Sequence, residues 1–215
     1  MSQVLTGAKE AIQANSVLRN TYILLSAMLL VSALCAYVSI DIGMSYGYRL
    51  VFTVIGFAML FVTMAFRNSA WGLLFITLFS IFQGLSIGPL LNHYLEMEGG
   101  SALVGQSLFG TAVVFVAMSA YALISKKNFS FMGGFLLAGL VVAILFMIAN
   151  IFIQSEMMSL GISAVVILIM SALILYDTSE IIHGGETSYI SATLSLYLSI
   201  LNIFLHLLNI LSADD

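Results

Sequence analysis

The charged residues of this 215-residue chain gather in short clusters, and long apolar stretches separate the clusters. The chain has only six Lys and Arg and ten Asp and Glu, which is 7% of its residues, whereas hydrophobic residues reach 61%. A typical soluble domain has about 25% charged residues. No water-soluble fold accounts for such a composition, and the sequence predicts a polytopic membrane protein.

A helix needs about 20 apolar residues to cross the hydrocarbon core of a bilayer. The stretches lack the strict alternation of a transmembrane barrel, so helices are the remaining way to satisfy the backbone in lipid. We therefore expect an all-α integral membrane protein, a seven-transmembrane-helix bundle over residues 20–215, preceded by a cytosolic tail over residues 1–19. The expected spans are Asn20–Ile40, Leu50–Phe66, Ala70–Leu91, Leu103–Ile124, Phe131–Ile153, Met158–Ile182 and Ile190–Leu211.

The basic residues predict the orientation, because cytoplasmic loops are enriched in Lys and Arg. Five of the six lie on one side of the expected membrane: Lys9, Arg19, Arg67, Lys126 and Lys127. Arg49 alone lies on the other side. The sequence thus predicts a cytoplasmic N-terminus and a periplasmic C-terminus. We expect the tail to be an amphipathic or disordered segment. It either leads into the membrane or is a segment that a cytosolic partner can bind.

Several classes of function are disfavoured by residue types. The net charge is −4 and basic residues form no stripe, which argues against nucleic acid as a partner. The single cysteine, Cys35, allows no intramolecular disulfide and supports no metal-thiolate site. The sequence has neither a helical zinc motif nor a nucleophile motif nor paired intramembrane aspartates, so we expect no metal, no cofactor and no enzymatic activity.

Ionisable residues inside a membrane span are costly and are functional candidates by default. Asp177 and Glu180 lie three residues apart near the end of the sixth stretch, so on a helix they share a face. We predict that this acidic pair takes up a proton near physiological pH. The alternative is that the helix ends at Tyr176 and leaves both acids in water.

The seventh stretch carries polar residues at successive spacings of four, three, four and three: Ser195, Ser199, Asn202, His206 and Asn209. This spacing predicts one polar stripe on a helix, which must face protein or water rather than lipid. Hydrogen bonding between helices is one interpretation. The other is the wall of a polar pathway, with His206 as a titrating group.

The third stretch contains Gln83, the pair Gly84 and Gly88, and Pro89, the only proline of the chain. Small residues four apart allow helices to approach closely, and proline frees a carbonyl one turn back. Close packing is the first interpretation. A bent helix that lines a cavity, with Gln83 in its wall, is the second.

Three of these motifs, in this order, resemble the transmembrane Bax inhibitor motif family over essentially the whole chain: the glycine and proline motif, Leu175–Ile181 and Leu196–Leu198. Three further stretches are similar to its bacterial YccA-like branch, the modulators of the FtsH protease: Val17–Tyr22, Ala149–Phe152 and Ile182–Thr187. The resemblance implies a multi-pass protein of the bacterial inner membrane.

The resemblance implies two different functions. Members of the YccA-like branch bind the membrane-anchored FtsH protease complex and limit its action on other substrates, and we expect this role first. Calcium-leak members instead use two aspartates, on helices six and seven, as a protonation-dependent gate for calcium ions or protons. Asp177 matches the first aspartate, whereas Ser199 stands at the position of the second, so the leak is our alternative. In that alternative Glu180 or His206 substitutes for the second aspartate as the titrating group. Arg67 is then the counter-charge of Asp177.

Overall fold

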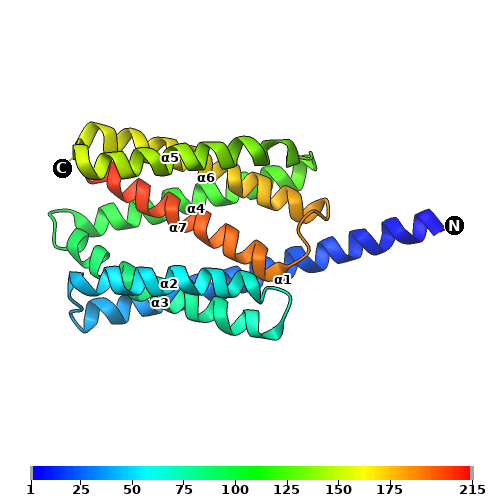
Figure 1. Ribbon diagram of the computed structural model, residues 1–215, viewed down its shortest axis with the longest axis horizontal. Coiled ribbons are helices and arrows are strands. Elements are labelled where there is room, and N and C mark those ends of the chain that lie inside the picture. The colour runs from blue at the N-terminus through cyan, green and yellow to red at the C-terminus, as the bar shows by residue number, and fades with distance from the viewer. Residues whose placement is uncertain (1, 214–215) are drawn as a thin grey trace. The chain divides into compact units, whose positions relative to one another are not determined.

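The computed structural model describes residues 2–213, with side chains from Ile12 onward. All seven α-helices in this range are long and apolar enough to cross a membrane, and the described residues contain no β-strand. The expected all-α bundle of seven transmembrane helices is therefore confirmed. The helices are α1 (Ser2–Asp41), α2 (Tyr46–Ala65), α3 (Ala70–Leu95), α4 (Gly100–Ser125), α5 (Gly133–Ile153), α6 (Glu156–Ile182) and α7 (Tyr189–Leu211), and the short 3-10 helix η1 (Ser130–Met132) precedes α5 (Figure 1).

The chain folds as two compact units. The first unit contains the residues up to Ser101 together with Glu186–Tyr197. The second contains Ala102–Gly185 together with the residues from Leu198 onward. Helix α7 is therefore divided, with its first residues in one unit and the remainder in the other.

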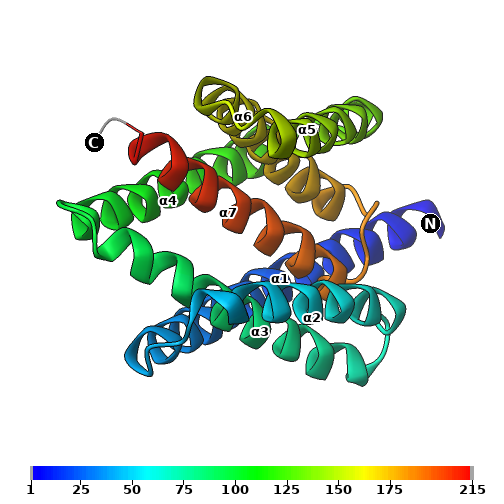
Figure 2. The same ribbon diagram turned by 60° about the vertical axis from the view of Figure 1, so that its left-hand side comes forward.

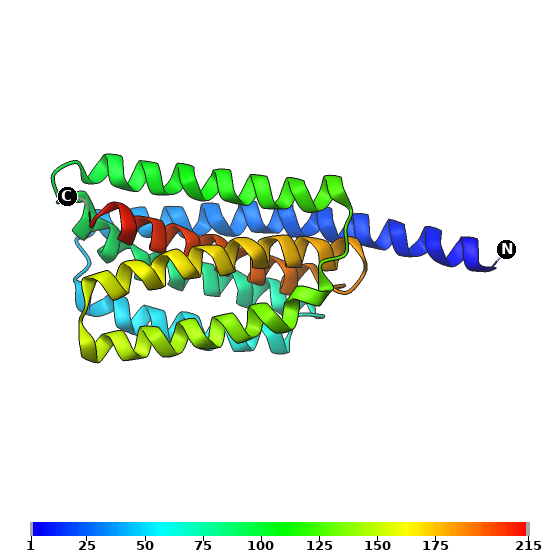
Figure 3. The same ribbon diagram turned by 90° about the horizontal axis from the view of Figure 1, so that it is seen from above.

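Helix α1 is one continuous helix of 40 residues, which corresponds to about 60 Å at 1.5 Å per residue. That length is about twice the hydrocarbon core of a bilayer. In the first unit α1 extends beyond the ends of α2 and α3 (Figure 1 and Figure 3). The boundary that we expected between a tail and a first span, at residue 19, is not marked by a break in this helix.

Helix α2 begins at Tyr46 rather than at Leu50, where the apolar stretch starts. Its first turn includes Arg49, whose guanidinium donates a hydrogen bond to the Tyr46 hydroxyl and lies 5.3 Å from the centre of the Tyr46 ring. A long basic side chain can lie along a helix and keep its charge at the membrane surface. The charge of Arg49 therefore does not delay the start of the helix.

Within the first unit, α3 packs against both α1 and α2 (Figure 2). Gly84 and Gly88 allow the approach of α1: a Cβ on Gly84 would lie 2.8 Å from the Cβ of Cys35, and one on Gly88 would lie 2.8 Å from the carbonyl oxygen of Ala36. Helix α3 continues through Pro89 to Leu95. These contacts are those that the close-packing interpretation predicts.

The start of α7 belongs to the same unit and is tied to α1 and α3 through Tyr197. The Ser32 hydroxyl donates to the carbonyl oxygen of Ser80 at 2.7 Å, so the Tyr197 hydroxyl, 2.5 Å away, is the donor to Ser32. The Tyr197 ring is 2% exposed and makes an edge contact with Phe79, with ring centres 5.2 Å apart. One buried side chain thus joins three helices.

In the second unit, α5 and α6 are antiparallel neighbours joined by only two residues, Gln154 and Ser155 (Figure 3). Gln154 adopts a left-handed conformation with φ of 53° and ends α5. The Asn150 side chain accepts a hydrogen bond from the Ser155 amide at 3.1 Å, and the Ser155 hydroxyl accepts one from the Met158 amide at 3.3 Å. These bonds satisfy groups at both helix ends and so permit the tight turn.

Candidate functional site

The acidic pair of the sixth span lies inside a helix, because α6 continues to Ile182. The alternative, in which the helix ends at Tyr176, is therefore wrong. Asp177 and Glu180 are both half-buried in the last turns of α6. Their helical spacing places both carboxylates near one face of the C-terminal end of this helix.

The segment Lys126–Ser130, which joins α4 to η1, packs on this end of α6. The Ser179 hydroxyl accepts a hydrogen bond from the Phe129 amide at 3.0 Å and lies 3.2 Å from the Lys127 carbonyl oxygen, to which it donates. Glu180 Oε1 lies 2.5 Å from the Ser130 hydroxyl. We call the segment Lys126–Ser130 the α4–α5 loop.

Gly185 makes room for the Glu180 carboxylate, because a Cβ on Gly185 would lie 2.9 Å from Glu180 Cδ. Gly184 just before it has φ of +76°, a conformation that favours glycine. Two residues at this end of α6 were not predicted as parts of the site: Ser179, and His183, whose Nε2 lies 3.2 Å from the Lys126 carbonyl oxygen. The pair Gly184 and Gly185 was an available signal, since glycines commonly follow the end of a helix.

The polar stripe of α7 forms hydrogen bonds with α6 in the second unit. His206 Nδ1 lies 2.9 Å from the Ser163 hydroxyl, and the Asn209 amide donates to the hydroxyls of Ser163 at 3.0 Å and Ser159 at 3.2 Å. Ser163 is 2% exposed. These bonds are those that the interpretation of hydrogen bonding between helices requires, and the sequence analysis did not identify Ser159 or Ser163 as the partners.

The other members of the stripe lie differently. The Asn202 amide donates to the Leu198 carbonyl oxygen of its own helix at 2.8 Å. Ser199 is buried, with 2% exposure. Ser195 is half-buried and belongs to the first unit, so the five residues of the stripe are divided between the two units.

We predict that Ser163→Ala lowers the stability of the protein by about 1 kcal/mol, because both His206 and Asn209 lose a hydrogen-bond partner inside the membrane span. Ser171→Ala is the matched control, since the Ser171 hydroxyl donates only to the Ile167 carbonyl oxygen of its own helix. Unfolding in mixed detergent micelles measures the difference. Equal stability of the two variants would contradict the prediction.

The remaining candidates belong to the first unit. Gln83 is half-buried and packs over Gly56 of α2, where a Cβ would lie 2.9 Å from Gln83 Oε1. The Arg67 side chain is exposed, and its carbonyl oxygen accepts a hydrogen bond from the Ser188 hydroxyl at 2.9 Å. Asp177 belongs to the second unit, so the role of Arg67 as its counter-charge stays a prediction.

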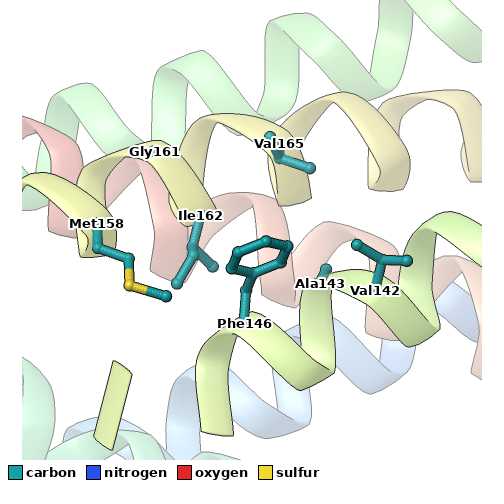
Figure 4. Close-up of a pocket in the computed structure, with 7 residues that line it drawn as sticks. All are labelled: Val142, Ala143, Phe146, Met158, Gly161, Ile162 and Val165. Atoms are coloured by element: carbon teal, nitrogen blue, oxygen red, sulfur yellow. The ribbon is translucent and has the colours of Figure 1, made fainter. Parts of the chain in front are cut away.

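A pocket of about 380 Å³ lies between α5 and α6 (Figure 4). Its lining is entirely apolar: Val142, Ala143, Phe146, Met158, Gly161, Ile162 and Val165. Such a lining offers no oxygen or nitrogen ligand to a cation. Among the described residues, no three His, Cys, Asp or Glu side chains are grouped so that they could hold a metal ion.

Seven apolar helices, with polar side chains gathered at one helix end and along the contact between α6 and α7, define a polytopic helical membrane protein. The family model described as "Inhibitor of apoptosis-promoting Bax1" matches residues 14–215. The chain therefore belongs to this Bax inhibitor family.

Relatives in other bacteria match almost the full length of the chain. It is 46% identical over 201 residues to the modulator of FtsH protease YccA of Escherichia coli K12, which covers 93% of this chain and 91% of that protein. It is 44% identical over 204 residues to an uncharacterized membrane protein of Vibrio cholerae, covering 94% and 92% of the two chains. A protein of Pseudomonas aeruginosa is 42% identical over 208 residues, covering 97% and 94%.

A relative from another strain, Escherichia coli O6:H1, is also 46% identical over 201 residues and is named as an inner membrane protein. Together with the seven spans, this similarity makes the chain a multi-pass protein of the bacterial inner membrane. The names of these relatives describe a modulator or a membrane protein, and they give no enzymatic activity.

Proposed function

We propose that the protein restrains the membrane-anchored FtsH protease through direct interaction in the inner membrane. The observation that carries this proposal is the 46% identity, over 93% of the chain, to a protein named as a modulator of FtsH protease. The similarity covers almost the whole length of both chains, so it is not confined to one part of the protein.

The first unit has two properties that suit a modulator of a protease that extracts its substrates from the membrane. Its helices α1 and α3 are in close contact at Gly84 and Gly88, which makes the body costly to separate. Helix α1 extends beyond α2 and α3 (Figure 1). In this proposal the extension, residues 2–16, is the part that the protease engages, and the packed body slows extraction.

We expect deletion of residues 2–16 to abolish co-purification with FtsH and the restraint of its action on other membrane substrates. The described side chains in this range, from Ile12 to Ser16, are exposed or half-exposed, and Val17, which is buried with 7% exposure, is kept in the deleted protein. The measurement is affinity purification from detergent-solubilised membranes, with degradation of a second FtsH substrate as the functional readout.

Asp177→Asn is the control, and we expect it to leave both readouts unchanged. An unrelated flexible sequence of equal length in place of residues 2–16 tests whether the segment acts by its sequence or only by its length. Full binding by the deleted protein would place the contact with FtsH elsewhere and contradict the role of the extension.

A second candidate function is a pH-sensitive leak of calcium ions or protons, because a half-buried Asp177 lies within α6 and matches an aspartate of the calcium-leak members. In this alternative Asp177 is the gate, with Glu180 or His206 as the second titrating group. Of the residues predicted to line a pathway, Ser199, Asn202 and Asn209 belong to the same unit as Asp177, and Gln83 and Ser195 belong to the first unit. Ser199, in place of a second aspartate, favours the modulator.

For the leak we expect calcium or proton flux into proteoliposomes to change between mildly acidic and mildly alkaline pH and to be altered in Asp177→Asn. This substitution removes the charge of Asp177 and leaves the size of the side chain nearly unchanged. Flux no greater than that of empty liposomes would exclude the leak and leave the protease modulator untouched.

A further inference from the structure

Two lysines, Lys126 and Lys127, follow one another directly after α4. Their side chains are exposed, and the α4–α5 loop to which they belong joins two membrane spans, so it lies at the surface of the bilayer. At such a place a lysine extends its stem along apolar surface and keeps its ammonium group in the head-group region. The described residues give neither lysine an ion-pair partner. The loop therefore presents two positive charges at one point of the membrane surface.

The backbone that carries the two lysines is fixed on the end of α6. The Lys127 carbonyl oxygen accepts a hydrogen bond from the Ser179 hydroxyl, and the Phe129 amide donates to the same hydroxyl. Figure 3 shows the loop crossing the end of α6 on its way from α4 to α5. A ligand that binds here does not have to order the loop, which reduces the entropic cost of binding.

Two acids lie near the lysines, but they are less exposed. Asp177 and Glu180 are half-buried on α6, and the Glu180 carboxylate accepts a hydrogen bond from the Ser130 hydroxyl. Asn128 Oδ1 accepts a hydrogen bond from the Ser130 amide at 2.8 Å. The NH2 group of the exposed Asn128 can only donate, and it forms no hydrogen bond with the described residues. An anion that approaches from outside thus meets two ammonium groups and an amide donor before it meets the acids.

Exposed aromatic side chains continue from this loop onto α5. The rings of Tyr121 and Phe129 have centres 6.0 Å apart, and those of Phe129 and Phe131 have centres 6.5 Å apart. Phe131 is 80% exposed and Phe135 is 78% exposed. Gly134 between them is also exposed, and a Cβ on it would meet no atom within 4 Å. The two phenylalanines therefore flank an open apolar notch, and the lysines precede it by only a few residues.

These two surfaces match the two parts of a lipid. We propose that the α4–α5 loop binds an anionic phospholipid of the phosphatidylglycerol type, with its phosphate at Lys126 and Lys127 and one acyl chain along Phe131, Gly134 and Phe135. The charge of the head group decides the choice, because a zwitterionic head group has its own ammonium beside the phosphate and is attracted less by two lysines. This inference does not depend on which of the two proposed functions is correct.

The test is fluorescence quenching by brominated lipids. Trp71→Phe removes the only tryptophan of the chain, and Phe131→Trp places a reporter at an exposed position of the proposed site. The full chain is reconstituted in mixtures of phosphatidylglycerol and phosphatidylcholine in which one or the other lipid is brominated. We expect phosphatidylglycerol to bind more tightly than phosphatidylcholine at this reporter, by about fivefold for each lysine, and the preference to fall at high salt.

Substitution of the lysines separates their charge from the apolar surface. The double variant with Lys126→Gln and Lys127→Gln keeps the length of both side chains, and we expect it to bind the two lipids about equally. Each single substitution should remove part of the preference. Arg67→Gln is the matched control, because Arg67 is also an exposed base in a loop between two spans but belongs to the first unit, and it should leave the preference unchanged.

Equal quenching by the two brominated lipids in the reporter protein with both lysines would overturn the proposal. A preference that survives the double substitution, or one that Arg67→Gln abolishes equally, would also overturn it. A preference that disappears in sodium phosphate but remains in sodium chloride of equal ionic strength would assign the lysines to free phosphate and reject the lipid.

Discussion

Replacement of Gly84 by leucine should prevent the first unit from folding, with an expected loss of at least about 3 kcal/mol in the free energy of unfolding. A Cβ at this position would lie 2.9 Å from the Cα of Ser32 and 2.8 Å from the Cβ of Cys35, and even closer to the Ser32 carbonyl oxygen. Two of these three atoms belong to the backbone of α1 and cannot be relieved by a rotamer change. Loss of the monodisperse protein peak in detergent, together with low membrane yield, measures the effect.

Gly105→Leu is the matched control, because Gly105 also lies within a transmembrane helix and a Cβ there would meet no atom within 4 Å. We expect this variant to accumulate and unfold like the unsubstituted protein. A Gly84→Leu protein as stable as the control would show that α1 and α3 are not held in close contact.

Tyr197→Ala should destabilise the protein by about 3 kcal/mol. The substitution removes a buried ring that contacts Phe79 and the hydroxyl that donates to Ser32, and it leaves a cavity where α7 meets α1 and α3. Thermal unfolding in detergent, followed by circular dichroism, measures the loss.

Two variants separate the contributions of the ring and the hydroxyl. Tyr197→Phe keeps the packing and should cost only about 1 kcal/mol, since Ser32 retains its bond to the Ser80 carbonyl oxygen. Tyr48→Ala removes a tyrosine that is 57% exposed and should have little effect on stability. A loss as large in Tyr48→Ala as in Tyr197→Ala would contradict the interpretation.

The spans could be predicted from the sequence because the bilayer imposes one dominant condition. Every segment of sufficient length and apolarity must form a helix, since lipid provides no partner for backbone groups. Arg49 shows where this reasoning fails at an edge: a charged residue closes the apolar stretch, but its side chain reaches Tyr46 and the helix includes it.

The candidate site could be predicted only in part. Asp177, His206 and Asn209 are conspicuous because polar residues are rare in apolar spans. The residues that surround them could not be predicted in the same way. Serines such as Ser163 and Ser179 are common in membrane helices, and they become hydrogen-bond partners only when a second helix or loop places a polar group beside them. His183 was missed for the same reason, since the carbonyl oxygen that its ring contacts belongs to Lys126, which is far from it in the sequence.

The sequence by itself thus determined the class of protein and the seven spans, and it marked Gly84 and Gly88 as positions where a second helix could approach closely, because hydropathy and residue size act locally. Only the tertiary structure decided which hydroxyls His206 and Asn209 of α7 meet, and that the α4–α5 loop rests on the end of α6. Hydrogen bonds between segments tens of residues apart depend on distance and direction in space, and a pattern along one chain carries neither.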